Sequence, residues 1–272
     1  MIKNVLRWPG GKSKALKQII PLLPTEIQSY YCEPMLGGGS LFLYLKQHGF
    51  AQDYWINDIY SPLIDFWKTL QDPEQAPRLQ EALDRYYAGS REPDSAKDLY
   101  RYLVDHQPTD MFDSAVRFFI LNRMTFSGLS ESGGFSAEAA LKRFTRSSFE
   151  KFQEMPEILQ GVQISNLPVE VILPEYRGFL FLDCPYYSAK KLYGKKGQIH
   201  QDFDHLQFVT LLHKYADNYQ FLLTYDAAVL DNPEIKKLLS SFQIRKWELV
   251  YGMNSFSAAT TTRGKEIFVT NY

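Results

Sequence analysis

The sequence predicts an α/β protein with a mostly parallel, doubly wound sheet, a helical insert and a terminal antiparallel hairpin. Three observations predict this fold. The first 60 residues alternate strand-like and helical patterns around a glycine-rich turn, residues 61–160 carry helical patterns with many charges, and strand-like runs return after residue 160. We therefore expect a sheet domain made of residues 1–60 and 161–272, with residues 61–160 inserted as a helical unit.

A strand, a turn, a helix and a second strand follow one another in the first segment. The aromatic run SYYCEP, residues 29–34, predicts a strand, and Gly37–Gly39 predict a tight turn after it. Ser40 is expected to cap the next helix, which Gly49 ends. A second strand then ends in an acid, Asp58. This order is typical of the nucleotide-binding half of a doubly wound sheet.

The strand-like runs of the last segment are rich in apolar and aromatic residues. They are VQISN at 162–166, GFLFLD at 178–183, YQFLLTYD at 219–226, IRKWELVY at 244–251 and EIFVTNY at 266–272. The last two runs predict the terminal hairpin. A helical pattern covers 206–215, and Asn232 with Pro233 begins another helix. In the insert, residues 125–148 are polar and contain glycine, which predicts an exposed loop.

Composition excludes several functional classes and leaves nucleic acid open. The 30 Lys and Arg against 31 Asp and Glu give a formal net charge of -1, so binding to a polyanion would need local cationic clusters. Two cysteines, Cys32 and Cys184, are too few for a disulfide framework and lack the spacing of a zinc site. We therefore expect no bound metal and a reducing cytoplasm. Neither a signal peptide nor an apolar run long enough to span a membrane is evident.

The turn after the first strand indicates a ligand that contains adenosine. Glycines let a backbone approach a ligand closely, and Asp58 is placed to bind a ribose. The alternative is a tight turn without a ligand. Gly37–Gly39 do not form a G-x-G-x-x-G pattern, which disfavours NAD and a dinucleotide oxidoreductase. Glu33 would repel a phosphate but can accept hydrogen bonds from a cationic amino group, which favours S-adenosylmethionine as the cofactor.

The stretch DCPYY, residues 183–187, follows a buried strand. It is expected at the same crevice, because ligands of doubly wound sheets bind beyond the carboxyl ends of the strands. Asp183 and the main-chain carbonyl of Cys184 form a pair of acceptors suited to an exocyclic amino group. Pro185 stiffens the turn and leaves that carbonyl free, and Tyr186 offers a flat face on which a base can stack.

These residues resemble a known family. DCPYY resembles the Asp-Pro-Pro-Tyr motif of amino-group DNA methyltransferases, and the order of the parts resembles the Dam-type, or alpha-group, adenine-N6 methyltransferases. The similarity covers nearly the whole chain and includes the segments RWPGGKSKAL, CEPMLGGGSLF, INDIYSPLI, LNRMTFSGL and GKEIFVTNY. The resemblance implies a Rossmann-like class I methyltransferase sheet, S-adenosylmethionine as the cofactor, and a DNA target-recognition role for the helical insert.

The site residues that the resemblance implies fall into three groups. The catalytic residues around a flipped adenine are Asp183, Cys184, Pro185 and Tyr186. The cofactor contacts are Trp8, Gly10, Lys12, Glu33, Pro34, Gly37, Gly39, Asp58, Asn166 and Asp183. The DNA contacts are Arg123, Phe126, Ser127, Leu129, Glu131, Lys190 and Lys191. Phe126 matches an aromatic position that the family inserts into the duplex.

Three positions depart from the family pattern. Cys184 replaces a proline, which leaves the main-chain acceptor in place but makes the turn less rigid. Glu131 stands where relatives often carry an arginine that reads guanine, and its carboxylate would suit the amino group of cytosine better. Asn166 stands where an acid is common near the cofactor adenine, and its amide can still form a hydrogen bond there.

The resemblance implies a site-specific adenine-N6 DNA methyltransferase that acts on double-stranded DNA as a monomer in the cytoplasm. A cognate restriction enzyme encoded nearby is one expected genetic setting. Two alternatives stay open. A cytosine-N4 methyltransferase would use the same geometry, although Asp183 at the head of the motif argues against it. An inactive DNA-binding relative would result if the change at Cys184 has abolished turnover.

Overall fold

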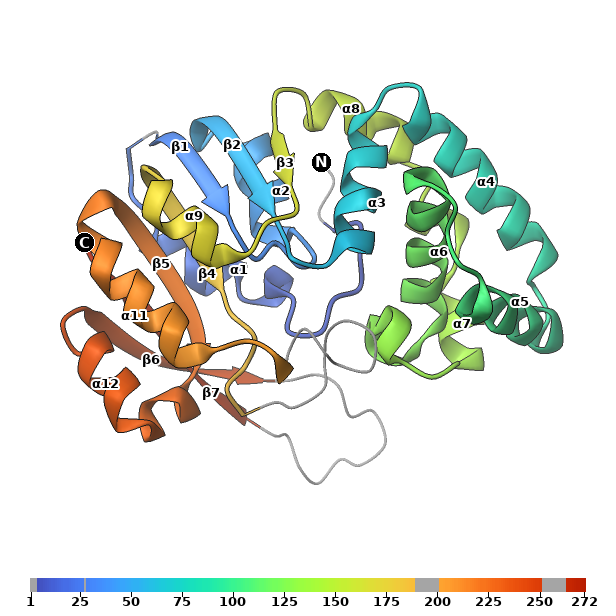
Figure 1. Cartoon of the computed structure of the whole chain (residues 1–272). Helices are drawn as coiled ribbons and strands as arrows, with labels where there is room; N and C mark the ends of the chain where they lie inside the picture. Colours follow the sequence, from blue (N-terminus) through green and yellow to red (C-terminus); the bar gives the residue numbers. More distant parts are fainter. Residues whose placement is uncertain (1–3, 27, 189–200, 251–262) are drawn as a thin grey trace.

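The computed structural model describes residues 4–26, 28–188, 201–250 and 263–272 (Figure 1). Within them, a seven-stranded sheet has the order β3-β2-β1-β4-β5-β7-β6. Its strands are β1 (Gln28–Glu33), β2 (Ala51–Asn57), β3 (Gln163–Ser165), β4 (Gly178–Asp183), β5 (Tyr219–Asp226), β6 (Gln243–Val250) and β7 (Arg263–Thr270). The first five strands run parallel, and β7 lies antiparallel between β5 and β6. The predicted fold class is therefore confirmed.

Helices cover both faces of this sheet. They are α1 (Leu16–Ile19), α2 (Ser40–Gln47), α9 (Val169–Glu175), α11 (His205–Tyr215) and α12 (Pro233–Leu239). Figure 1 shows α9 and α11 in front of the strands. The helix predicted at 206–215 is α11, and the helix predicted to begin at Asn232 is α12, which Asn232 caps through its side chain. No helix in the described part of the chain has both the length and the apolar character needed to cross a bilayer.

Alternate residues of β4 belong to two cores, one on each face of the sheet. Phe179 and Phe181 belong to one cluster of buried residues, and Leu180 and Leu182 belong to the other. Successive side chains of a strand point to opposite faces, so an uninterrupted apolar run suits a strand that is covered on both sides. Asp183 ends this run. The strand therefore delivers one carboxylate to the edge of the sheet.

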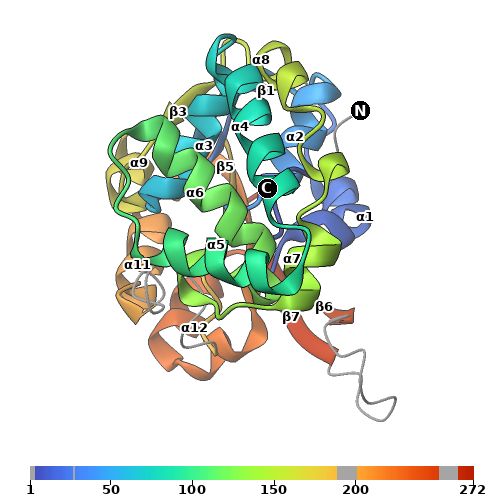
Figure 2. The same cartoon turned by 90° about the vertical axis from the view of Figure 1, so that its right-hand side faces the viewer.

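The helical insert gathers at one side of the sheet (Figures 1 and 2). Its helices are α3 (Ser61–Gln71), α4 (Gln75–Gly89), α5 (Pro93–Asp105), α6 (Met111–Met124), α7 (Ala137–Arg143) and α8 (Met155–Ile158). Every residue of α6 from Ser114 to Met124 is buried. The ring of Phe119 on this helix stacks on Phe66 of α3 at 5.6 Å between centroids. The same cluster of buried residues continues into the sheet at Tyr31, so the insert and the sheet share a core.

The segment 125–148 differs from the exposed loop that its polar composition predicts. It contains α7 and several short turns, and Thr125, Ala140 and Phe144 are fully buried. Its polar side chains form caps and turns, in which they bond to the local backbone. The prediction of an exposed loop was therefore wrong for most of this segment. Several residues of the segment are exposed, among them Phe126, which is 64% exposed.

Candidate active site

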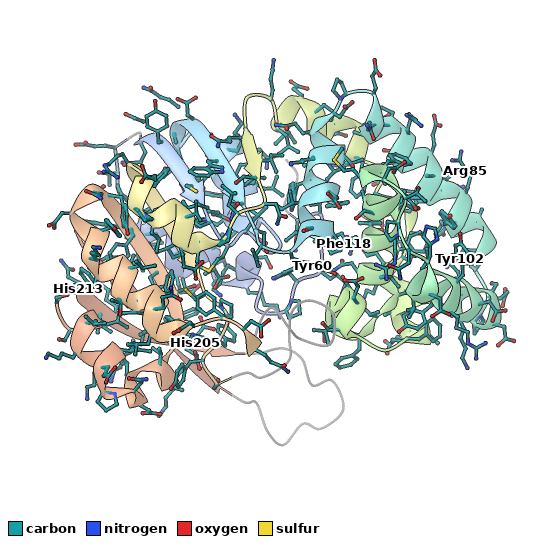
Figure 3. The ribbon with its side chains drawn as sticks, in the orientation of Figure 1. Tyr60, Arg85, Tyr102, Phe118, His205 and His213 are labelled. Atoms are coloured by element: carbon teal, nitrogen blue, oxygen red, sulfur yellow. The ribbon has the colours of Figure 1, made fainter. Side chains whose placement is uncertain are left out.

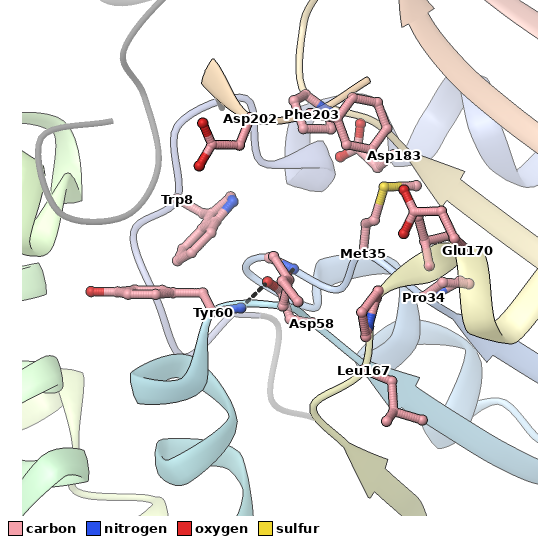
Figure 4. A pocket seen from close by; sticks show the side chains of 15 residues that line it. Trp8, Pro34, Met35, Asp58, Tyr60, Leu167, Glu170, Asp183, Asp202 and Phe203 are labelled. Atoms are coloured by element: carbon pink, nitrogen blue, oxygen red, sulfur yellow. Dashed lines mark hydrogen bonds between the residues drawn. The ribbon is translucent and has the colours of Figure 1, made fainter. Parts of the chain in front are cut away.

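A pocket with a volume of about 340 Å³ opens where the parallel strands end (Figure 4). Its walls come from the segments that follow several of these strands and from the N-terminal segment. Six of the predicted site residues line this pocket, namely Trp8, Pro34, Gly37, Asp58, Asp183 and Pro185. Parallel strands joined by crossovers bring their carboxyl ends to one edge, which is why residues so distant in sequence meet here.

The glycine turn is shaped by the indole of Trp8. Gly37 and Gly39 adopt φ angles of 51° and 63°, a region that side chains disfavour. A Cβ atom on Gly37 would lie 2.5 Å from Nε1 of Trp8, so a side chain cannot be placed there without moving the ring. Gly39 is also the N-cap residue of α2, and Ser40 is the first helical residue. The prediction that Ser40 caps this helix was wrong.

Asp58 joins the glycine turn to the start of α3. Its Oδ2 accepts a hydrogen bond from the backbone N–H of Gly37 at 2.9 Å. Its Oδ1 accepts one from the backbone N–H of Tyr60 at 3.0 Å, which Figure 4 shows as a dashed line. Burial raises the pKa of Asp58 to about 6. Asn166 lies beside it, where its Nδ2 donates to the Asp58 carbonyl at 2.7 Å and its Oδ1 accepts from Ser61 at 2.9 Å.

Glu33 lies at the end of β1 and is only 2% exposed. Its Oε1 accepts a hydrogen bond from the hydroxyl of Tyr31. Burial, which disfavours a charged carboxylate, raises the pKa of Glu33 to about 8. Glu33 lines a narrow cavity of about 10 Å³ together with Lys12, Gly38 and Asp183. The structure therefore places a buried, readily protonated carboxyl group next to the main pocket.

Two donors converge on one oxygen of Asp183. Nζ of Lys12 lies 2.5 Å from Oδ1 of Asp183, and the hydroxyl of Thr224 on β5 donates to the same atom at 2.7 Å. Lys12 also donates to the carbonyl of Gly10 at 3.2 Å and lies 3.4 Å from the hydroxyl of Tyr186. These contacts fix the orientation of the carboxylate. A ligand can then approach it from the side of its other oxygen, Oδ2.

The turn that follows β4 is attached to two strands of the C-terminal half, β5 and β7. The hydroxyl of Tyr186 donates to Oε1 of Glu266 on β7 at 2.7 Å. Asp226, at the end of β5, accepts hydrogen bonds from the backbone N–H groups of Tyr187 at 2.6 Å and Ser188 at 2.9 Å. This network holds the turn in one conformation and supports the aromatic side chain within it.

The side chain of Cys184 points away from this chemistry. It is 3% exposed and belongs to the cluster of buried residues beneath α9, α11 and α12. Burial raises the pKa of its thiol well above the usual value, so the thiol is neutral and unreactive. The following residue, Pro185, lines the pocket. The exchange of proline for cysteine at 184 is therefore a change in packing.

The sequence from residue 8 to residue 253 matches the family model of the D12 class of N6 adenine-specific DNA methyltransferases. The chain belongs to this family. Its substrate is therefore DNA, and the amino group of adenine is the methyl acceptor. The resemblance seen in the sequence is confirmed, and neither cytosine-N4 transfer nor an inactive relative is favoured.

Several Type II methyltransferases are similar to this D12-class enzyme. M.CviBI of Paramecium bursaria Chlorella virus NC1A is 24% identical, in an alignment that covers 71% of this chain and 72% of that protein. M.MjaIII of Methanocaldococcus jannaschii is 26% identical over 70% of this chain and 71% of that protein. M1.LlaDCHI of Lactococcus lactis subsp. cremoris is 26% identical over 100% of this chain and 96% of that protein.

Arg123 of this D12-class enzyme lies in the interior. It is 8% exposed, its Nη2 donates to the carbonyl of Val5 at 2.8 Å, and its guanidinium lies 4.9 Å from the centroid of the Phe119 ring. Burial lowers the pKa of Arg123 to about 10. This side chain attaches the end of α6 to the N-terminal segment, and its predicted contact with DNA stays a prediction.

Glu131 is also engaged by the protein. Its Oε1 accepts a hydrogen bond from Nη1 of Arg117 at 2.6 Å, and its Oε2 accepts one from the hydroxyl of Tyr60 at 2.7 Å. Burial and the adjacent carboxylate raise the pKa of Tyr60, so Tyr60 is the donor. Both oxygens of Glu131 already have protein donors. That this carboxylate reads a base stays a prediction.

Three of the remaining predicted DNA contacts lie among the described residues, and two do not. Phe126 is exposed, Ser127 has a φ angle of 54°, and Leu129 is half-buried. They occupy the turn between α6 and α7 and stay predictions. Lys190 and Lys191 lie outside the described residues.

Several residues of the site were not predicted from the sequence. Thr224, Asp226 and Glu266 support the catalytic turn from β5 and β7, and Tyr60 lines the pocket. A signal was present, because the apolar run YQFLLTYD ends in polar residues as GFLFLD does. No local signal marks Glu266, which lies inside a strand. Among the described residues, no three His, Cys, Asp or Glu side chains are grouped so that they could hold a metal ion.

Proposed function

We propose that this D12-class enzyme uses S-adenosylmethionine as the methyl donor and methylates an adenine that has been flipped out of a specific duplex site. The observation that carries the proposal is the position of Asp183. Its carboxylate lines the same pocket as the glycine turn and Asp58. An amino group bound to this carboxylate would therefore face a ligand bound beside the glycine turn. A base inside a duplex cannot reach such a pocket, so it must leave the stack.

The residues around the turn suit S-adenosylmethionine. Gly37 and the Trp8 ring that packs against it both line the pocket, so a ligand bound there would lie beside the glycine turn. Asp58 and Asn166 would hold the adenosine, and Glu33 would attract the cationic amino group. When bound, the cofactor supplies a methyl group made electrophilic by the sulfonium. Lys12, which was predicted as a cofactor contact, is better assigned to positioning Asp183.

The amino nitrogen of adenine is a weak nucleophile, because its lone pair is delocalised into the ring. Asp183 Oδ2 and the carbonyl of Cys184 would each accept one amino hydrogen, which draws the nitrogen toward tetrahedral geometry and directs its lone pair. The same carboxylate stabilises the positive charge that develops on the nitrogen. Tyr186, fixed by Glu266, would stack on the base. Most of the acceleration then comes from positioning and electrostatics.

The insert, residues 61–160, is proposed to recognise the target sequence. Phe126 is the exposed aromatic residue at the turn after α6, and such a side chain can enter the stack and favour extrusion of a base. Ser127 and Leu129 flank it. We propose further that the enzyme is a monomer in the cytoplasm, where its DNA substrate lies, and that its genetic partner is a restriction enzyme of the same specificity.

Methylation mapping tests this function. The protein is incubated with labelled S-adenosylmethionine and mixed duplex DNA, and the DNA is then digested to nucleosides and sequenced for modified positions. Label in N6-methyladenine at one recurring sequence supports the proposal. Label in another base, or none, contradicts it. Asp183→Ala should abolish transfer while DNA is still bound, and Asp98→Ala, on the exposed face of α5, is the matched control. Sedimentation of the protein tests the monomer.

A further inference from the structure

Glu131 connects the pocket to the segment that carries Phe126. One of its oxygens binds Arg117 of α6, and the other binds Tyr60, which follows β2. Figure 4 shows the Tyr60 side chain at the edge of the pocket with its hydroxyl directed away toward the insert. Figure 3 shows Tyr60 and Phe118 between the two halves of the protein, and their rings are 5.8 Å apart.

The connection continues on the pocket side. The backbone N–H of Tyr60 donates to Asp58, and Asp58 accepts from the N–H of Gly37. The glycine turn is therefore linked through Asp58 to the backbone of Tyr60, and the hydroxyl of Tyr60 is linked through Glu131 to Arg117. A ligand in the pocket would therefore contact residues that are linked to the Glu131 carboxylate.

The buried charge of Arg117 holds the carboxylate of Glu131 in this position. Arg117 is 7% exposed, and its Nε donates to the carbonyl of Leu103 at 2.7 Å. A guanidinium in such surroundings needs an acidic partner, and Glu131 supplies it at 2.6 Å. Because the carboxylate is bound at both oxygens, it links α6 to Tyr60.

We propose that Glu131 is a positioning residue that couples occupancy of the pocket to the placement of the DNA-contacting turn at 125–131. Bound cofactor then raises the affinity for DNA, and bound DNA raises the affinity for cofactor by the same factor. This inference rests on the proposed function, because it takes the pocket as the cofactor site and the turn as a DNA contact.

The test measures the coupling factor directly. The dissociation constant of S-adenosylhomocysteine is determined with and without a duplex that carries the mapped recognition sequence. The wild-type ratio should be about fivefold or more. Tyr60→Phe keeps the ring and the Glu131–Arg117 ion pair but removes the hydroxyl, so the ratio should fall toward one. Glu131→Gln should do the same, and the double variant should show no further loss.

Controls separate coupling from general damage. Tyr102→Phe, at an exposed position of α5, and Glu138→Gln, on the surface of α7, should keep the wild-type ratio. The methylated sequence should be the same for Glu131→Gln as for the wild type, since a residue that reads a base would change it. An unchanged ratio in Tyr60→Phe, a wild-type ratio of one or an altered recognition sequence would overturn the inference. A wild-type protein that binds no S-adenosylhomocysteine would instead remove the proposed function, and the inference with it.

Discussion

Asn122 binds both backbone polar groups of Arg7. Its Oδ1 accepts a hydrogen bond from the Arg7 N–H at 3.1 Å, and its Nδ2 donates to the Arg7 carbonyl at 2.7 Å. The same Nδ2 donates to the carbonyl of Gly128 at 2.9 Å. Gly128 has a φ angle of 75°, and a Cβ there would lie 2.4 Å from the Arg7 carbonyl oxygen. One side chain thus fixes the segment that carries Trp8 against the turn that carries Phe126.

Replacement of Asn122 by alanine should destabilise the protein strongly. Asn122→Ala leaves the N–H and carbonyl of Arg7 without this partner and removes one of two donors to the Gly128 carbonyl. Each buried polar group left unsatisfied costs on the order of 1–3 kcal/mol. We expect a loss of about 3 kcal/mol in the free energy of unfolding, measured by urea denaturation. Asn232→Ala, which removes only the cap of α12, is the control and should cost about 1 kcal/mol. A smaller loss at Asn122 than at Asn232 would contradict this account.

Thr224 should contribute to turnover through Asp183. A hydrogen bond to a charged group contributes roughly 1.5–3 kcal/mol, so Thr224→Val should lower kcat by about tenfold to a hundredfold. The KM for the cofactor should stay nearly constant, because Thr224 contacts the carboxylate alone. Steady-state kinetics measure both quantities. Thr210→Val on the exposed side of α11 is the matched control, and an equal effect at both positions would show that the bond to Asp183 is irrelevant.

Glu33 should make stability depend on pH. Its pKa rises from 4.5 to about 8 on burial. A carboxyl group with a raised pKa in the folded state stabilises the fold fully below the unfolded pKa, and this contribution is lost as the pH rises through the folded pKa. Between pH 4.5 and pH 8, Glu33→Gln should therefore flatten the decline in unfolding free energy. The exposed Glu26→Gln should leave the pH profile unchanged.

The same group should couple cofactor binding to proton release. A cationic amino group near Glu33 favours the ionised carboxylate, so binding of S-adenosylmethionine should tighten as the pH rises toward 8 and release a proton. Calorimetry in two buffers of different ionisation enthalpy measures that proton. In Glu33→Gln the release should disappear, and a release of the same size would argue against Glu33 as its source.

Phe126 should matter for DNA and little for folding. Its side chain is 64% exposed, so Phe126→Ala should change the unfolding free energy by less than about 0.5 kcal/mol. Loss of an aromatic group that stacks on bases should weaken duplex binding by about 1–3 kcal/mol. Fluorescence of 2-aminopurine at the target position reports extrusion of the base. Tyr102→Ala, a similarly exposed aromatic on α5, should leave this signal at its wild-type level.

The features that could be predicted from the sequence have local causes. Gly37 is needed where φ is positive, and Asp183 stands at the end of an apolar run, so neither depends on distant partners. Arg123 and Glu131 do depend on them. Val5 is 118 positions from Arg123, and Tyr60 is 71 positions from Glu131. A charged residue near an apolar run has the same sequence pattern whether it faces solvent or binds a buried group.

Short elements were equally hard to predict. Helix α9 has 7 residues and contains Pro174, so its pattern completes barely two turns and resembles a loop. Segment 125–148 was predicted as an exposed loop but contains a helix and turns, because its Ser and Thr side chains cap helices and turns instead of facing water. In both cases tertiary packing decided what local propensity left open.

Burial of both sulfhydryls makes the protein convenient for site-directed labelling. The chain has 2 cysteines, and Cys32 and Cys184 are 0% and 3% exposed. Maleimide dyes react with accessible thiolates, so the wild-type chain provides a silent background. A single cysteine introduced at Tyr102 would then carry one fluorophore, and its emission would follow the insert as DNA arrives, without any native residue being removed from the catalytic turn.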